Sequence, residues 1–223
     1  MTRPVTTAVV PLRDGSGKTR LADRFGAQQR SDLVAVLARH VVAALLDAGV
    51  VRDVLVVTRD PGFAAAALPA DPRLTVVSQP VDRPGLNAAV DLGRRLAVVG
   101  GAGRLLMIHA DLPLLDAADV RALLAPDAPL VLAPDDAGEG TNALVLDASV
   151  RGFAFRFGPG SRAAHAVHGA ALGLRTAVVH RPGTATDLDT PADWARLPAA
   201  TRETLSASSD RGGRRPRPAS AAG

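Results

Sequence analysis

The chain of 223 residues contains no cysteine and no tyrosine, and only 3% of its residues are aromatic. The lack of cysteine excludes disulfide bonds and thiolate metal sites. The 47% of hydrophobic residues is enough for a substantial core, and because so few of them are aromatic, that core must be built from Ala, Val and Leu. Long apolar runs are also missing, since charged residues such as Asp47 interrupt them, and no signal-peptide pattern opens the chain. We therefore expect a soluble, cytoplasmic protein without membrane contact.

Lysine is almost missing as well: Lys18 is the only one, and the other cationic side chains are arginines. The net charge is +4, with a pI near 11.0. Four arginines (Arg211, Arg214, Arg215, Arg217) against Asp210 supply +3 of this charge, which leaves about +1 for the remaining chain. We predict a disordered basic tail at 206–223. The main domain, 1–205, lacks basic patches with interleaved aromatics, so no nucleic-acid partner is expected for it.

Apolar runs without alternation are separated by segments of helical periodicity, and the chain length fits one domain. Strands are predicted at 8–12, 54–58, 74–77, 104–109, 130–133, 142–146 and 176–179, with helices at 28–48, 64–68, 88–98, 117–124 and 160–171, and one from about 190. This pattern favours an α/β fold whose mainly parallel central sheet has helices on both faces. Ligands bind at the carboxyl ends of such strands, so one mouth should collect Arg13–Arg20, Asp60, Asn87 and Asp111.

The polar loop after the first strand is the first candidate site. Gly15 and Gly17 allow a close backbone approach, and Arg13, Lys18 and Arg20 add positive charge that suits a polyphosphate. A P-loop is excluded, because its pattern requires glycine at the position of Leu12. The loop alone leaves nucleotide binding and an ordinary basic loop open.

Carboxylates supply the second candidate site. Asp111 follows a buried strand and precedes Leu112-Pro113, a position suited to a hard cation, while Asp116 is the better cap for the next helix. Asp187 and Asp189 are spaced i and i+2 before another helix. Because Asp189 or Thr190 caps that helix, Asp187 becomes the second ligand candidate. Magnesium takes one or two carboxylates together with substrate phosphate oxygens.

A third candidate is the turn at 157–162, which opens a helix. Its free N–H groups, the Ser161 hydroxyl and the Arg162 guanidinium suit a small anion, although an ordinary capped turn has the same residues. His165 and His168 are spaced for a transition metal, but surface histidines are the simpler interpretation.

These blocks together resemble the 2-phospho-L-lactate or phosphoenolpyruvate guanylyltransferases of coenzyme F-420 biosynthesis. The resemblance covers about residues 5–197 and lies in 18–21, 85–89, 110–113, 140–144, 157–165 and 187–191. It implies a GT-A-like nucleotidyltransferase fold for the domain at 1–205, with Mg²⁺ as cofactor. The implied partners are GTP and a phosphorylated three-carbon acid. Arg13 stands where many relatives have lysine, which keeps the charge.

The resemblance also implies residue roles. Lys18 and Asp111 would be catalytic, and Asp111 and Asp187 would bind the metal. Arg13, Lys18, Arg20, Gly85 and Asn87 would bind the nucleotide, and Thr141, Gly158 and Ser161 would bind the acid. The acceptor phosphate would attack the α-phosphorus of GTP without a general base.

Several alternatives stay open. Molybdopterin guanylyltransferases share the fold but open with a Gly-Gly-rich loop, where this chain has Pro11-Leu12-Arg13. A non-catalytic nucleotide-binding regulator is a second alternative, and a structural or RNA-binding protein acting through the basic tail is a third. The sequence does not distinguish phosphoenolpyruvate, 2-phospho-L-lactate and 3-phosphoglycerate as acceptors. It leaves the oligomeric state open too, a homodimer included.

Overall fold

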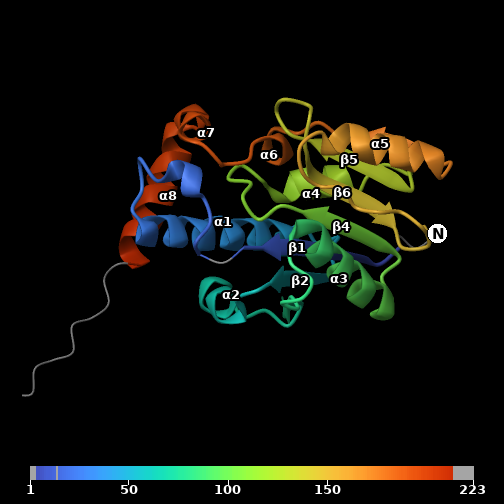
Figure 1. The fold of residues 1–223 in the computed structure, drawn as a ribbon, viewed down its shortest axis with the longest axis horizontal. Helices are drawn as coiled ribbons and strands as arrows, with labels where there is room; N and C mark the ends of the chain where they lie inside the picture. Colours follow the sequence, from blue (N-terminus) through green and yellow to red (C-terminus); the bar gives the residue numbers. More distant parts are fainter. Residues whose placement is uncertain (1–3, 14, 213–223) are drawn as a thin grey trace, which may run out of the picture.

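A computed structural model describes residues 4–13 and 15–212. Its strands are β1 (Thr6–Leu12), β2 (Asp53–Thr58), β3 (Leu74–Ser78), β4 (Arg104–Ile108), β5 (Leu130–Pro134), β6 (Thr141–Asp147) and β7 (Thr176–Val178). Its helices are η1 (Thr19–Leu21), α1 (Ala27–Asp47), α2 (Pro61–Ala67), α3 (Leu86–Val99), α4 (Ala117–Leu123), α5 (Ser161–Ala171), α6 (Pro182–Ala185), α7 (Pro191–Arg196) and α8 (Ala199–Gly212). The predicted alternation of strands and helices is confirmed (Figure 1).

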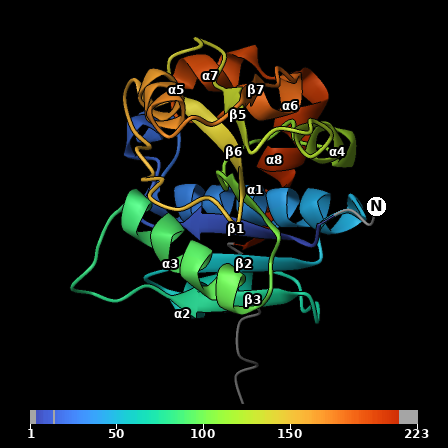
Figure 2. The same ribbon diagram turned by 90° about the vertical axis from the view of Figure 1, so that its right-hand side faces the viewer.

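The strands form one seven-stranded sheet in the order β3-β2-β1-β4-β6-β5-β7. Its neighbours pair in parallel, except that β6 is antiparallel to both β4 and β5. The prediction of a mainly parallel sheet is therefore confirmed. Because β6 runs the other way, its first residue, Thr141, lies at the edge of the sheet where β4 ends. Figure 2 shows the two ends of this sheet, with α2 near β3 and α5 to α7 at the opposite end.

Two apolar layers cover the two faces of the sheet. One contains side chains of α1, α2 and α4 against alternate residues of β1, such as Val10. The other contains side chains of α3 and α5 and the phenylalanines at 153, 155 and 157, packed against Val9. Successive β1 residues thus point to opposite layers, both of them apolar, which explains why the strand reads as a continuous apolar run.

A third apolar cluster joins the C-terminal helices to the first half of α1. It contains Leu33 and Leu37 of α1, Trp194 of α7 and Leu205 of α8, and α8 lies against α1 in Figure 1. The predicted boundary between domain and tail, after residue 205, falls within α8. Residues 213–223 of the predicted tail lie outside the described residues. None of the described helices is both long and apolar enough to span a membrane.

Candidate active site

The loop after β1 carries Lys18 into a cluster of carboxylates. Lys18 adopts a left-handed conformation with φ of 58°, and its side chain is only 9% exposed. The Nζ atom donates to Oδ2 of Asp111 and, over 2.5 Å, to Oδ1 of Asp189. Burial lowers the pKa of Lys18, but the two carboxylates outweigh burial and the net pKa is raised. The ammonium therefore stays charged at neutral pH.

Asp111 lies just past the end of β4, as its sequence context predicts. Burial raises the pKa of its carboxyl, but Lys18 and His109 outweigh burial, so that the net pKa is lowered and the group is ionised. Oδ2 accepts from Lys18, whereas Oδ1 is buried and has no hydrogen-bond partner among the described residues. Asp111 therefore keeps one charged oxygen free for a further ligand.

Asp187 and Asp189 bring two more carboxylates to the same place. The backbone N–H of Leu188 donates to the carbonyl of Asp111 over 3.1 Å, which ties this segment to the end of β4. Burial, Asp111 and Asp189, in this order, raise the pKa of Asp187. Its Oδ1 lies 3.4 Å from Nδ2 of Asn142. The three carboxylates thus repel one another, and Lys18 is paired with two of them, Asp111 and Asp189.

The sequence interpretation missed the role of Asp189. Thr190 caps α7, since its hydroxyl accepts from the backbone N–H of Asp193 and Pro191 follows at the first helical position. Asp189 is therefore free to pair with Lys18. The i, i+2 spacing of Asp187 and Asp189 was the available signal, because alternate residues of an extended segment point to the same side.

Among the described residues, no group of three or more His, Asp or Glu side chains has the geometry of a metal site. The free Oδ1 of Asp111 and the carboxylate of Asp187 nevertheless offer the hard oxygen ligands that magnesium prefers. This number of protein ligands is enough when phosphate oxygens complete the coordination shell.

A cavity of ≈ 770 Å³ opens at the carboxyl ends of β1 to β4. Its walls include six of the predicted site residues, namely Arg13, Lys18, Arg20, Gly85, Asp111 and Asp187, together with Asp189. Gly85 has φ of 96°, a conformation that strongly favours glycine, and it is the N-cap residue that precedes α3. One end of the cavity is therefore ionic. The other end includes Val57, Leu86, Ala89 and Gln79, with Arg59 directly after β2 as its cationic residue.

Asp60 and Asn87, which we also expected at this mouth, have other partners. Asp60 caps α2 by accepting from the backbone N–H of Phe63. The Asn87 amide both donates to the Phe157 carbonyl (3.1 Å) and accepts from its N–H (2.8 Å). Asn87 therefore fixes the start of α3 to the turn that contains Gly158, and it is not part of the cavity wall.

Thr141, Gly158 and Ser161 lie together beside this turn, outside the cavity wall. Thr141 and Ser161 are 2% and 1% exposed. Gly158 has φ of 132°, which favours glycine, and its carbonyl accepts from the Ser161 N–H at the start of α5. The Ser161 hydroxyl has no hydrogen-bond partner in the part of the chain that the structure describes. This group therefore has polar donors to offer to an anion.

His165 orients the Thr141 hydroxyl. Its Nε2 accepts from the Arg156 N–H over 2.9 Å, so the ring proton must be on Nδ1, which lies 3.1 Å from Oγ1 of Thr141. Burial, and then the positive charges of Arg156 and His168, lower the pKa of His165 to about 4, so the ring is neutral. Because the Thr141 hydroxyl accepts from His165, its own proton is free to be donated elsewhere.

The two alternatives that we considered for the histidines of α5 are wrong for His165. It is fully buried rather than at the surface, and both of its ring nitrogens are hydrogen-bonded. Nε2 of His168 accepts from the Ala154 N–H. The Nε2 atoms of His165 and His168 therefore both accept a backbone N–H and are not available to a transition metal.

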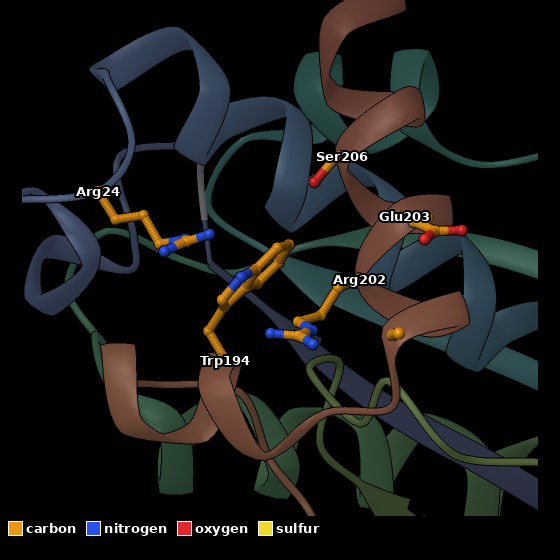
Figure 3. A pocket seen from close by; sticks show the side chains of 6 residues that line it. Arg24, Trp194, Arg202, Glu203 and Ser206 are labelled. Carbon is orange, nitrogen blue, oxygen red and sulfur yellow. The ribbon is translucent and has the colours of Figure 1, made fainter.

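A smaller pocket of ≈ 260 Å³ lies against α7 and α8, and no predicted site residue lines it (Figure 3). The Arg24 guanidinium stacks over the Trp194 ring, 5.3 Å from its centroid. Arg202, Glu203 and Ser206 of α8 form the opposite wall (Figure 3). This pocket is therefore separate from the carboxylate cluster.

A model of a known protein family matches most of the chain. The family model described as "Guanylyl transferase CofC like" matches residues 6–206. A phosphoenolpyruvate guanylyltransferase from Rubrobacter xylanophilus is 44% identical over 197 residues, which are 86% of this chain and 93% of that protein. A second, from Sphaerobacter thermophilus, is 38% identical over 214 residues, which are 93% of this chain and 99% of that protein.

Solved structures with the same fold are more distant in sequence. A nucleotidyl transferase from Methanothermobacter superposes with a TM-score of 0.64 at 22% identity, covering 90% of this chain and 99% of that one. A 4-diphosphocytidyl-2C-methyl-D-erythritol synthase from Anaerococcus prevotii gives 0.57 at 12% identity, covering 92% and 99%. These likenesses confirm the predicted nucleotidyltransferase fold.

Proposed function

Because the chain belongs to the CofC-like guanylyl transferase family, we propose that it transfers GMP from GTP to the phosphate of phosphoenolpyruvate in coenzyme F-420 biosynthesis. Two relatives that carry the name phosphoenolpyruvate guanylyltransferase match most of the chain, which favours this acceptor over 2-phospho-L-lactate and 3-phosphoglycerate. The observation that supports the proposal best is the ionic end of the cavity, where cationic side chains of one loop face three carboxylates.

The triphosphate would lie against the loop after β1. Lys18 has a compact ammonium and Arg20 a planar guanidinium, and both residues line the cavity. Arg13, earlier in the same loop, also lines it. Lys18 is bound to Asp111 and Asp189 without a nucleotide, so a phosphate would compete with these carboxylates for the ammonium. The two ion pairs would therefore hold a charged lysine beside the site where the triphosphate binds.

Asp111 and Asp187 would hold Mg²⁺, and Oδ1 of Asp111, which has no hydrogen-bond partner among the described residues, is its oxygen left for the ion. When bound, the ion would supply positive charge to the triphosphate and to the leaving pyrophosphate. The chain itself fixes these ligands, through the Leu188–Asp111 backbone hydrogen bond and the contact of Asn142 with Asp187.

Thr141, Gly158 and Ser161 would bind the acceptor, as the sequence interpretation predicts. The free proton of Thr141, the Ser161 hydroxyl and the N-terminus of α5 all favour an anion at this place. An oxygen of the acceptor phosphate forms a bond to the α-phosphorus of GTP, and the bond from that phosphorus to the bridging oxygen breaks. Pyrophosphate leaves with the electron pair. The second pKa of a phosphate monoester is about 6, so the attacking oxygen needs no general base at neutral pH.

The test is pyrophosphate release from GTP and Mg²⁺ with each of the three acids supplied separately. We expect release with phosphoenolpyruvate. Release only with phospholactate or only with phosphoglycerate would show that the enzyme catalyses the same reaction with that acid as the acceptor. Folded protein that binds GTP but releases nothing with any of them would contradict the proposal, and would favour a molybdopterin-type transferase or a regulator.

A further inference from the structure

Gln79 is the neutral polar side chain at the end of the cavity away from the carboxylates. It follows directly after β3 and is 7% exposed. Its backbone N–H donates to the Thr58 carbonyl over 2.7 Å, which holds it beside the end of β2. Its side chain forms part of the cavity wall, next to Gly85, Leu86 and Ala89.

The amide of Gln79 has a single allowed orientation. Its Nε2 donates to the carbonyl oxygens of Arg83 (2.8 Å) and Gly85 (2.9 Å). Both partners are acceptors only, so a flipped amide would place Oε1 against two carbonyl oxygens. Both amide protons are used in this way, whereas Oε1 has no partner within residues 4–13 and 15–212. It is also not among the enclosed, unpartnered polar atoms of these residues. Gln79 therefore presents a fixed acceptor to the cavity.

The position of Gln79 suits the base of a nucleotide. Gln79 follows β3 and Asp111 follows β4, which are three steps apart in the sheet order β3-β2-β1-β4. At about 4.8 Å for each step across the sheet, the two strand ends lie roughly 14 Å apart. With the phosphates at Lys18 and Asp111, the base would reach the end of the cavity where Val57, Leu86 and Ala89 offer apolar surface and Gln79 offers one acceptor.

We propose that Oε1 of Gln79 selects guanine by accepting a hydrogen bond from its N1–H or its 2-amino group. This inference rests on the proposed use of GTP. Adenine has an unprotonated N1 and no 2-amino group at this edge, so it would leave Oε1 unpaired and facing a lone pair. The amide cannot turn to offer its NH₂ to adenine, because Arg83 and Gly85 hold it. A site built to pair with a donor rejects the analogue that lacks it, by up to about 10⁴-fold.

The test compares GTP and ATP binding by calorimetry with Mg²⁺ and no acceptor, in the wild type and in Gln79→Met and Gln79→Glu. Methionine removes the acceptor, so the ratio of GTP to ATP affinity should fall at least 10-fold. Glutamate keeps an acceptor but loses the two loop bonds, so both affinities should fall while the ratio is largely kept. Arg83→Ala is the control, since its exposed side chain is not used here. ITP, which keeps N1–H but lacks the 2-amino group, identifies the donor.

An equal loss of GTP and ATP binding in Gln79→Met would overturn the inference, because it would show that Gln79 only supports the loop. So would a wild type that binds both nucleotides equally. Circular dichroism and melting temperature check that each variant is folded. The binding readout is independent of transfer: a Gln79-dependent preference for GTP without pyrophosphate release would refute the proposed function and leave this inference intact.

Discussion

Lys18 illustrates how far single residues could be interpreted from the sequence. As the only lysine of the chain, Lys18 is a candidate for binding phosphate. Asp111 and Asp187 are candidates for binding metal, because no local structural role explains them. The partners of Lys18 lie 93 and 171 positions away, so no local pattern contained the ion pairs. The pairing of Asp189 with Lys18 was missed because a helix-capping role already explained Asp189 locally. Sequence patterns find residues without a local purpose, but not the partners that tertiary structure gives them.

Replacing Asp111 by asparagine tests the role of its free oxygen. Asp111→Asn should lower kcat by about 10²–10³-fold, as is typical when charge stabilisation of a transition state is removed. The fold should persist, because Lys18 keeps Asp189 as a partner. The measurements are steady-state pyrophosphate release and thermal melting.

Asp116→Ala is the matched control for Asp111→Asn. It removes the cap of α4, so it should cost about 1 kcal/mol of stability and leave kcat unchanged. An unfolded or a fully active Asp111→Asn variant would contradict the role assigned to Asp111.

His165 makes a prediction about stability and pH. Its pKa is lowered to about 4 in the folded state, from an ordinary value of 6.5. Between these values the unfolded chain binds more protons, so the free energy of unfolding rises with pH there. This contribution is complete above pH 6.5 and is lost as the pH falls towards 4. His165→Gln should lack it, which urea unfolding at a series of pH values would measure.

The exposed His180→Gln variant is the control for this series and should follow the wild type. If wild type and His165→Gln show the same pH dependence, the neutral Nδ1–H form of His165, and with it the orientation of Thr141, loses its support.

At the scale of elements, most helices and strands were predictable because their apolar residues recur with the right period. Leu33, Leu37, Val41 and Leu45 mark the buried side of α1 at every fourth position. The direction of β6 was not predictable in this way, because a strand buried on both faces is equally apolar in either direction. Helix α8 was missed because its sequence is polar, and among its described side chains Leu205 is the one that packs in the third cluster.

The attachment of α8 can therefore be tested at one residue. Leu205 is buried against α1, so Leu205→Ala should lower the free energy of unfolding by about 2–5 kcal/mol. Trp194, the single tryptophan, lies in the same cluster and reports unfolding by its fluorescence. Thr204→Ala, on the exposed side of α8, should change the free energy by no more than about 0.5 kcal/mol. Equal urea midpoints for the two variants would show that α8 does not stabilise the domain.

At the scale of the whole molecule, nucleotide and metal should stabilise the fold together. A ligand at 100 times its Kd adds about 2.7 kcal/mol to the free energy of unfolding. In a chain of this size this should raise Tm by roughly 5–10 °C. The predicted Mg²⁺ ligands come from the end of β4 and from the segment before α7, and the nucleotide would touch the ends of β1 to β3. Binding would therefore add contacts between distant parts of the chain and offset the carboxylate repulsion that raises the pKa of Asp187.

The measurement is a melting curve with GTP in the presence of Mg²⁺ or of a chelator. GTP should raise Tm more in the presence of Mg²⁺ than in the presence of the chelator. In Asp111→Asn the additional increase due to Mg²⁺ should be lost, while the increase due to GTP alone should remain. A metal-independent shift of the same size in both proteins would mean that Asp111 does not hold the ion. Since Lys18 is paired with Asp111 and Asp189 when no ligand is bound, Mg²⁺ alone should shift Tm less than Mg²⁺ with GTP. The phosphates of GTP would draw Lys18 away and leave Asp111 to the metal.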